Sequence, residues 1–225
     1  MVVELLKTGI KGFDDIVGGG LPKGHTILLA GPIGSYADEF ALEYAYRGTE
    51  AGQKSIYVTF EKDAEDLVQA GEEFGWKIKE AIKAKNLLVI ASELFNYEQL
   101  MATLEDEIFS YKADRVVIDS VTFLGGFFDS KFKYRKSIAD MRRMLNKHEC
   151  TTLLVSETQG ELLSPYGIEE FIADGVIHFH AIEKRGELMQ AVSIPEIKGV
   201  QVKSCMYPVE ETSKGLKIRD APLVL

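Results

Sequence analysis

The sequence predicts an α/β fold in which helices cover both faces of a mostly parallel central sheet, with an antiparallel extension at the C-terminal end. Nearly continuous apolar runs alternate with helix-like segments as far as residue 156, as is typical of parallel strands buried on both faces. After Asp174 the runs are short and joined by turns, which indicates antiparallel pairing. We find no internal repeat or linker and therefore expect a single domain over residues 1–225.

Five runs rich in β-branched, aliphatic or aromatic residues predict the parallel strands. In chain order they cover residues 26–30, 55–60, 86–91, 115–120 and 151–156. The first run follows a segment with glycines at 18, 19, 20 and 24, which indicates tight turns. The fourth run reaches a carboxylate, Asp119, near its end. Four further short strands are expected in the C-terminal extension, over 176–182, 187–194, 206–209 and 215–218.

Four helices are expected between the parallel strands, over 38–51, 63–75, 97–111 and about 134–147. The first has a broad apolar face and ends before Gly52. Asp63 is expected to cap the second, because Glu65 and Asp66 place negative charge in its first turn, where the helix N-terminus favours it.

Composition argues against several functional classes. The formal net charge is -9 and the isoelectric point is near 5.1, which disfavours general affinity for nucleic acid or anionic membranes. No apolar run is long enough to span a membrane, and the first residues lack the features of a signal peptide. Cys150 and Cys205 are far apart and have no metal-ligand spacing, so reduced thiols and a cytoplasmic location are expected.

A candidate phosphate-binding loop follows the first strand: Gly31-Pro32-Ile33-Gly34-Ser35-Tyr36-Ala37-Asp38. It has the strand–loop–helix context that the P-loop pattern G-x-x-x-x-G-K-[ST] requires. The pattern starts at Gly31, but the chain then has Tyr36, Ala37 and Asp38 where the pattern needs Gly, Lys and Ser or Thr.

Several other landmarks surround this loop in a fixed order. They are Thr8-Gly9-Ile10, Phe13-Asp14, the turn 18–24, Gly75-Trp76, Ile118-Asp119-Ser120, the stretch 166–176 and Tyr207-Pro208. Their order resembles the RecA-like ATPases, and within them the KaiC family, nearly from end to end of the chain. The resemblance implies a RecA-like three-layer αβα sandwich that binds ATP and often stacks into hexameric rings with nucleotide between subunits.

The sequence departs from the family pattern at other positions too. Lys62 stands where the family usually has the second of two glutamates, the candidate general base. Glu196-Ile197-Lys198-Gly199 stands where the family has Lys-x-Arg-Gly, whose basic groups reach a neighbour's phosphates. Glu61 and Asp119 remain. We therefore expect no catalytic residue, with Glu61 and Asp119 as remnants of the family's site.

The changes in the loop all oppose phosphate binding. Ala37 removes charge-assisted contacts, each worth about 1.5–3 kcal/mol. Asp38 and Glu39 bring negative charge to the phosphate position, and we expect them to cap the free N–H groups of the following helix instead. Tyr36 places a Cβ where the loop needs glycine for a positive φ or a close backbone approach.

No cofactor is therefore expected, with two alternatives left open. ATP and Mg²⁺ still bind the altered loop in one of them. In the other, Asp38, Glu61 and Asp119 converge on a bare divalent cation, because hard cations prefer clustered oxygens. The simpler interpretation makes Lys62 a local counter-ion.

Three other features are candidate sites. The basic segment 131–147 has interleaved aromatic residues, which suits either nucleic acid or a solvated helix face that meets an acidic partner. The apolar segment 123–128 is either core or an interface. His178 and His180 share one face of a strand, but without a third ligand in local spacing they are expected to be ordinary strand residues.

The favoured hypothesis is a domain that has lost ATPase activity and acts as a binding or regulatory module, through a protein partner or an active paralogue. Homo-oligomers are also compatible with the sequence, and no membrane association is expected. The first alternative is a weak or atypical ATPase that uses Asp119 and a cation supplied in trans. The second is an accessory protein of DNA recombination that binds nucleic acid through the basic segment.

Overall fold

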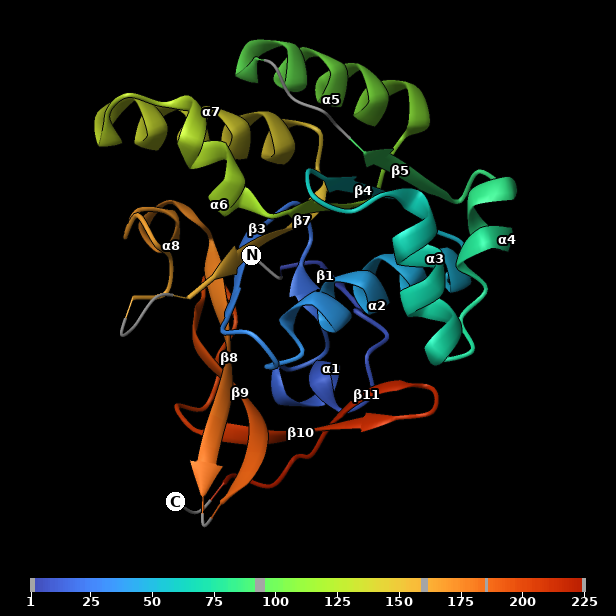
Figure 1. Ribbon diagram of the computed structural model, residues 1–225, viewed down its shortest axis with the longest axis vertical. Coiled ribbons are helices and arrows are strands. Elements are labelled where there is room, and N and C mark those ends of the chain that lie inside the picture. Colours follow the sequence, from blue (N-terminus) through green and yellow to red (C-terminus); the bar gives the residue numbers. More distant parts are fainter. Residues whose placement is uncertain (1–2, 92–95, 159–161, 185, 224–225) are drawn as a thin grey trace.

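The computed structural model describes residues 3–91, 96–158, 162–184 and 186–223, and its centre is a sheet of nine strands (Figure 1). Their order is β11-β10-β9-β8-β3-β7-β6-β4-β5. The parallel strands are β3 (Thr26–Gly31), β4 (Ser55–Thr59), β5 (Leu87–Ala91), β6 (Arg115–Asp119) and β7 (Thr151–Glu157). The others are β8 (Gly175–Lys184), β9 (Glu187–Ile197), β10 (Met206–Thr212) and β11 (Gly215–Ile218).

Strand β8 joins the two parts of the sheet, because it pairs parallel with β3 and antiparallel with β9. The pairs β9–β10 and β10–β11 are antiparallel as well. The predicted mostly parallel sheet with an antiparallel C-terminal extension is therefore confirmed. A separate pair, β1 (Leu5–Leu6) with β2 (Leu21–Pro22), carries the N-terminal segment.

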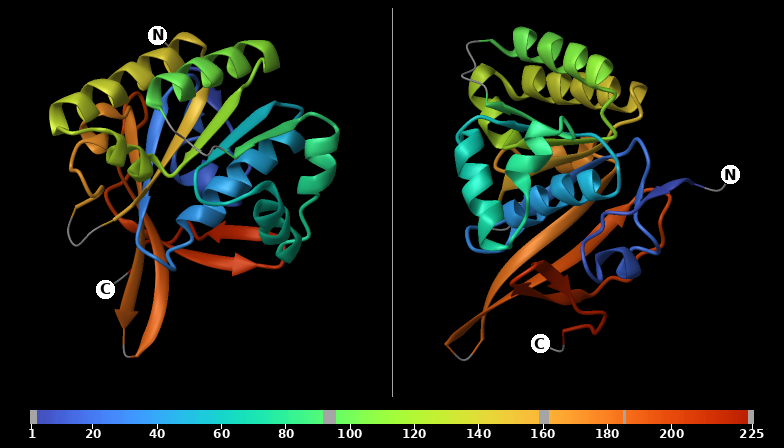
Figure 2. Two further views of the ribbon diagram at one scale, coloured as in Figure 1. Left: turned by 45° about the horizontal axis from the view of Figure 1, so that its top comes forward. Right: turned by 90° about the vertical axis from the view of Figure 1, so that its right-hand side faces the viewer.

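Helices cover both faces of the parallel part, which completes three layers (Figures 1 and 2). One face carries α1 (Phe13–Ile16), α2 (Ala37–Glu50), α3 (Ala64–Glu73) and α4 (Ile78–Lys83). The other carries α5 (Tyr97–Tyr111), α6 (Val121–Leu124), α7 (Lys131–Lys147) and α8 (Glu169–Ile172). Each layer buries its own apolar cluster against the sheet. None of these helices combines the length and the apolar character that crossing a lipid bilayer would need.

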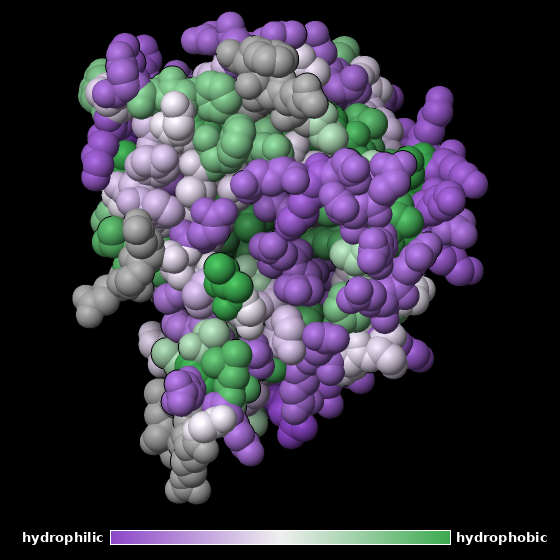
Figure 3. All heavy atoms as spheres, viewed as in Figure 1, coloured by the Kyte–Doolittle hydropathy of each residue, from purple (hydrophilic) through white to green (hydrophobic). Residues whose placement is uncertain are grey.

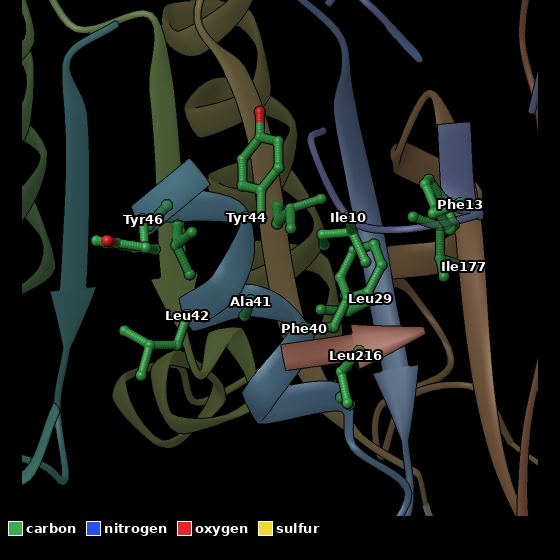
Figure 4. Close-up of a cluster of buried hydrophobic side chains, with 14 of the residues drawn as sticks. Ile10, Phe13, Leu29, Phe40, Ala41, Leu42, Tyr44, Tyr46, Ile177 and Leu216 are labelled. Carbon is green, nitrogen blue, oxygen red and sulfur yellow. The ribbon is translucent and has the colours of Figure 1, made fainter. Parts of the chain in front are cut away.

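The layer of α1, α2, α3 and α4 lies below the sheet in Figure 1 and is called the lower layer; the layer of α5, α6, α7 and α8 is the upper layer. Helix α2 lies at the centre of the lower layer (Figure 4). Phe40 faces β3 and β8, and its ring makes edge-on contacts with Phe13 and Phe179 at centroid distances of 4.9 Å and 5.3 Å. Leu42 and Tyr46 lie on the side of α2 away from Leu29. Strands β10 and β11 lie below α2 in Figure 2, so the antiparallel extension covers the helix on that side.

The structure also differs from the sequence-based expectations in detail. Helix α4 was not predicted, because its six residues are too short to give a clear helical period. Segment 123–128, for which no helix was predicted, forms the end of α6 and a 3₁₀ turn over Gly125–Phe127. Helix α7 begins three residues before the predicted start, because the side chain of Ser130 caps it.

Asp63 caps α3 as predicted. Its carboxylate accepts the N–H of Asp66 at 2.9 Å, and the carboxylate of Asp66 accepts the N–H of Asp63 at 2.9 Å. This capping box fixes the start of α3 directly after Lys62. The start of α3 thereby sets where the Lys62 side chain leaves the backbone.

Candidate functional site

The candidate site is a cavity of about 400 Å³ at the carboxyl edge of the parallel strands, between the loop 31–38 and the ends of β4, β6 and β7. Ligands of open α/β sheets bind at this edge. The structure brings together the residues of the candidate loop with Glu61, Lys62 and Asp119, as the sequence predicted. The lining consists of residues 31–39, Glu61, Lys62, Asp119, Ser120, Val155, Ser156 and Glu157.

The backbone of the loop bends at Gly34 and Tyr36. Gly34 has φ 75°, and Tyr36, the residue before α2, has φ 70° in the left-handed region. Tyr36 thus occupies the conformation for which the P-loop pattern supplies a glycine, as the sequence suggested. Holding a residue with a Cβ there is unfavourable by about 1–2 kcal/mol. Part of the compensation is packing, because the Tyr36 side chain contacts the lower apolar cluster.

Lys62 bridges two carboxylates inside the cavity. Its Nζ lies 2.9 Å from Oδ2 of Asp38 and 3.2 Å from Oδ2 of Asp119. The hydroxyl of Tyr57, in β4, donates to the same oxygen of Asp119 at 2.7 Å. The expectation that Lys62 acts as a local counter-ion is therefore confirmed, and the loop and two strand ends are joined through one ammonium group.

The environment shifts the pKa values of this group. Burial raises the pKa of Asp119, although Lys62 opposes the shift. Burial alone lowers the pKa of Lys62, but Asp119 and Asp38 together outweigh it and raise that pKa. Burial, followed by the negative charge of Asp119, raises the pKa of the Tyr57 hydroxyl. Lys62 therefore stays charged and Tyr57 stays a hydrogen-bond donor near neutral pH.

Asp38 does not cap α2. The side chain of Tyr36, the residue before the helix, makes no capping hydrogen bond, and the Asp38 carboxylate bonds to Lys62 instead. The expected capping was wrong for Asp38, because a lysine ammonium within reach is a stronger partner than a neutral N–H group.

Glu61 lies in the same cavity but on its other side, near Glu157. Burial and then the charge of Glu61 raise the pKa of Glu157, and the Ser120 hydroxyl lies 3.4 Å from a Glu157 oxygen. Within the described ranges, no three His, Cys, Asp or Glu side chains are arranged to hold a metal ion. The Lys62 ammonium lies between Asp38 and Asp119.

Sequence reasoning missed Tyr57, Ser120, Ser156 and Glu157. Glu157 is the last residue of β7 and stands opposite Gly31 of β3. A carboxylate directly after the fifth predicted strand could have pointed to it. Tyr57 gave no signal, because an aromatic residue in a strand is ordinary core.

Most of the basic segment is neutralised within the chain. Ion pairs join Lys133 to Asp129, Arg143 to Asp140 and Lys147 to Glu105. Arg142 is bound to Asp174, which is nearly buried. These partners leave less positive charge for nucleic-acid phosphates than the sequence alone suggested.

The remaining candidate features make contacts within the chain. The rings of His178 and His180 lie 3.9 Å apart, and His180 shares a hydrogen bond of 2.8 Å with Ser193. Lys198 turns towards its own chain and donates to the backbone oxygen of Ala173 at 3.0 Å. In segment 123–128, Leu124 is buried, and Phe123 is partly exposed and stacks on Phe60.

The chain has a Gly-Pro loop between the central parallel strand β3 and helix α2, and β6, two places along the sheet, ends on an aspartate. This arrangement defines a RecA-type domain with the P-loop NTPase fold. The chain belongs to the KaiC family: the family model described as "ATPase: KaiC" matches residues 6–222.

Curated relatives agree with this assignment. The circadian clock oscillator protein KaiC of Parathermosynechococcus lividus is 30% identical over 94% of this chain, which spans 42% of that protein. The KaiC of Acaryochloris marina is 30% identical over 96% of this chain, which spans 44% of it. The chain thus spans less than half the length of these relatives.

A solved structure matches over nearly the whole of both chains. The crystal structure of a KaiC-like protein from the hyperthermophilic archaeon Pyrococcus horikoshii is 32% identical and superposes with a TM-score of 0.90. The match covers 96% of this chain and 99% of that one. The RecA-type fold and the resemblance to KaiC inferred from the sequence are therefore confirmed.

Proposed function

We propose that this KaiC-family chain does not take nucleotide in its loop cavity and acts as a non-hydrolysing binding or regulatory module. The observation that carries the proposal is the Lys62 bridge. The one ammonium group among the described residues that line the cavity is held by Asp38 and Asp119, at 2.9 Å and 3.2 Å. It is therefore neutralised by the protein itself rather than offered to phosphates.

The charge of the cavity supports the same proposal. Its lining contains five carboxylates, those of Asp38, Glu39, Glu61, Asp119 and Glu157, against the single cation. A nucleotide triphosphate would add several negative charges to this surplus. P-loop proteins bind phosphates with a lysine and with N–H groups at a helix N-terminus, and position 37 offers only the methyl group of Ala37.

A module of this kind would work through protein partners. Candidates are an active paralogue with the same fold or other copies of this chain, since the resemblance implies ring-forming relatives. Glu196 and Lys198 are exposed. They lie in the segment where, by the resemblance, the basic groups of the family would reach a neighbour's phosphates. With Glu196 acidic, a contact there would not depend on a nucleotide.

Isothermal titration of the chain with Mg-ATP tests the proposal directly. We expect no binding at micromolar nucleotide, and micromolar or tighter binding would contradict it. A matched variant restores the P-loop pattern with Tyr36→Gly, Ala37→Lys and Asp38→Thr, and we expect it to gain affinity. A folded variant that binds no better than the native chain would show that these three positions do not account for the loss.

A weak or atypical ATPase is the second candidate. It is favoured by the size of the cavity, about 400 Å³, and by the position of Asp119 at the end of β6. It requires a cation or a basic group from another molecule to displace Lys62. Phosphate release that disappears in Asp119→Ala, in a preparation free of contaminating ATPases, would favour this candidate over the first.

A further inference from the structure

A second cavity, of about 280 Å³, lies between α2 and α3 on the side of Lys62 away from the loop cavity. Asp38, Glu39 and Lys62 line both cavities. The remaining lining residues are Leu42, Tyr57, Asp66, Leu67, Ala70 and Phe74. The proposed function makes no use of this cavity.

The floor of the α2–α3 cavity is apolar. Leu42, Tyr57, Leu67 and Phe74 belong to the lower hydrophobic core, and each is less than 8% exposed. Leu42 lies on the side of α2 away from the central strand (Figure 4), where α3 packs. Ala70 is exposed at the edge. Pockets with such a lining and a few polar groups are typical of small-molecule sites.

The rim of the cavity is acidic, and its carboxylates differ in their partners. Asp38 is bound to Lys62, and Asp66 accepts the N–H of Asp63 in the capping box. Glu39 has no ion-pair partner: the side chain is about half-buried, its own N–H is the backbone group that acts on its carboxylate, and within the described residues no basic group forms an ion pair with it. Hydrophilic side chains gather over α3 and α4 around this region, with apolar atoms visible between them (Figure 3).

Glu39 is therefore the group whose charge is least compensated. Burial raises its pKa, its own N–H opposes the shift, and the charges of Asp38 and Glu211 raise it further. Lys62 lowers this pKa by less than any of these effects changes it. A cation beside Glu39 would relieve a carboxylate that is partly removed from water and surrounded by like charge.

We propose that the α2–α3 cavity binds a small organic cation, an amine or amidine with an apolar body. The apolar body lies against Leu42, Leu67 and Phe74, and the positive group is held by Glu39. The size of the cavity limits the ligand to about the bulk of one aromatic ring with a short side chain. An anion is disfavoured by the surplus of carboxylates at the rim, and a neutral molecule leaves Glu39 uncompensated.

This inference is independent of the proposed function, because it concerns a different cavity. The two are nevertheless neighbours through Lys62. A cation beside Glu39 lies close to the Lys62–Asp38 bridge and repels the ammonium of Lys62. Its binding would therefore weaken this bridge, which also lines the loop cavity.

Two-dimensional ¹⁵N–¹H NMR titration of the native chain tests the proposal with three probes that share one body: phenethylamine, 2-phenylethanol and phenylacetate. We expect the amine to shift the amide signals of α2 and α3 around the cavity. The alcohol should bind about tenfold more weakly, because a charge-assisted hydrogen bond contributes at least that factor. The carboxylate should not bind. Equal affinity for amine and alcohol, or no shifts at millimolar amine, would overturn the proposal.

Variants separate the charge from the cavity. Glu39→Gln should reduce the affinity for the amine to that for the alcohol while leaving alcohol binding unchanged, which also shows that the cavity is intact. Ala70→Trp should block all binding by filling the mouth. Glu65→Gln and Gln69→Trp, which alter exposed residues of α3 outside the cavity, are the matched controls and should bind the amine as the native chain does. An affinity for the amine that is unchanged in Glu39→Gln, or amine binding that persists in Ala70→Trp, would refute the assignment.

Discussion

Lys62 Nζ and Asp119 Oδ2 lie 3.2 Å apart, although 57 residues separate them in the chain. The contact follows from strand order, because β4 and β6 are neighbours with Thr59 opposite Asp119. Lys62 follows β4 by three residues, and its N–H donates to the Thr59 hydroxyl at 3.1 Å. The pairing of two parallel strands thus places a cation beside the carboxylate at the end of one of them.

Removing this cation should destabilise the fold. Lys62→Met leaves Asp119, whose side chain is 9% exposed, without a positive partner. We expect a loss of about 1–2 kcal/mol in the free energy of unfolding, less than for a fully buried pair because Lys62 is itself 36% exposed. Urea unfolding at neutral pH measures it. Adding Asp119→Asn to Lys62→Met should recover part of the loss, and an additive double variant would show that the pair is not coupled.

Arg115 should matter more to stability than any other basic residue of the described structure. Its guanidinium is buried and donates to the backbone oxygens of Lys7, Thr8 and Tyr44 and to the side chain of Gln53. Arg115→Met leaves these buried acceptors without a donor, so we expect a loss of about 3 kcal/mol. Chemical denaturation measures the loss.

The control for Arg115 is Arg143→Met, because Arg143 is 71% exposed. We expect a change within about 0.5 kcal/mol for this variant. Faster proteolysis near the N-terminus should accompany Arg115→Met, since Arg115 holds residues 7 and 8 in place. Equal stabilities of the two variants would contradict the assigned role of Arg115.

Two tyrosines of the upper layer offer a matched comparison. The Tyr134 hydroxyl donates to the buried carboxylate of Glu169 at 2.5 Å, whereas the buried hydroxyl of Tyr111 has no partner among the described residues. Tyr134→Phe should lower the free energy of unfolding by about 2 kcal/mol, because Glu169 loses a donor. Tyr111→Phe should be neutral or stabilising. Thermal unfolding of both variants measures the difference, and an equal loss would count against this account.

His178 should contribute a pH dependence. Burial, and then the neighbouring His180, lower the pKa of His178 from 6.5 to about 4. The folded state therefore binds fewer protons than the unfolded state between these values, so stability is complete above pH 6.5 and falls as the pH drops towards 4. After allowance for partial exposure we expect a contribution of about 1 kcal/mol. Urea unfolding of the native chain and of His178→Gln from pH 7 to pH 4 measures it, and curves of identical slope would contradict it.

The sequence predicted the fold because its signals were local. The five apolar runs fell within a residue or two of the parallel strands β3 to β7, and the spacing from Gly31 placed the loop. Lys62 was expected as a counter-ion because it follows the second strand at the edge where carboxylates gather. These features depend on periodicity, turn residues and the common direction of parallel strands.

The rest of the site depends on register between distant segments. That Tyr57 points at Asp119, and that Glu157 faces the loop, follows from which strands are neighbours and from which residues stand opposite each other. The burial of Arg115 could not be predicted either, because an arginine at the start of a strand is usually exposed. Two of its acceptors, the backbone oxygens of Lys7 and Thr8, come from an N-terminal segment more than a hundred positions away.

The Lys62 bridge also sets the minimum affinity with which a free cation can bind at Asp38 and Asp119. An ammonium group tethered to the same chain competes at an effective concentration of the order of millimolar or above, which dilution cannot lower. A cation from solution must therefore displace the Lys62 ammonium from Asp38 and Asp119, whereas no basic side chain of the described residues forms an ion pair with Glu39. The two cavities share lining residues, but the same cation would bind in them at different concentrations.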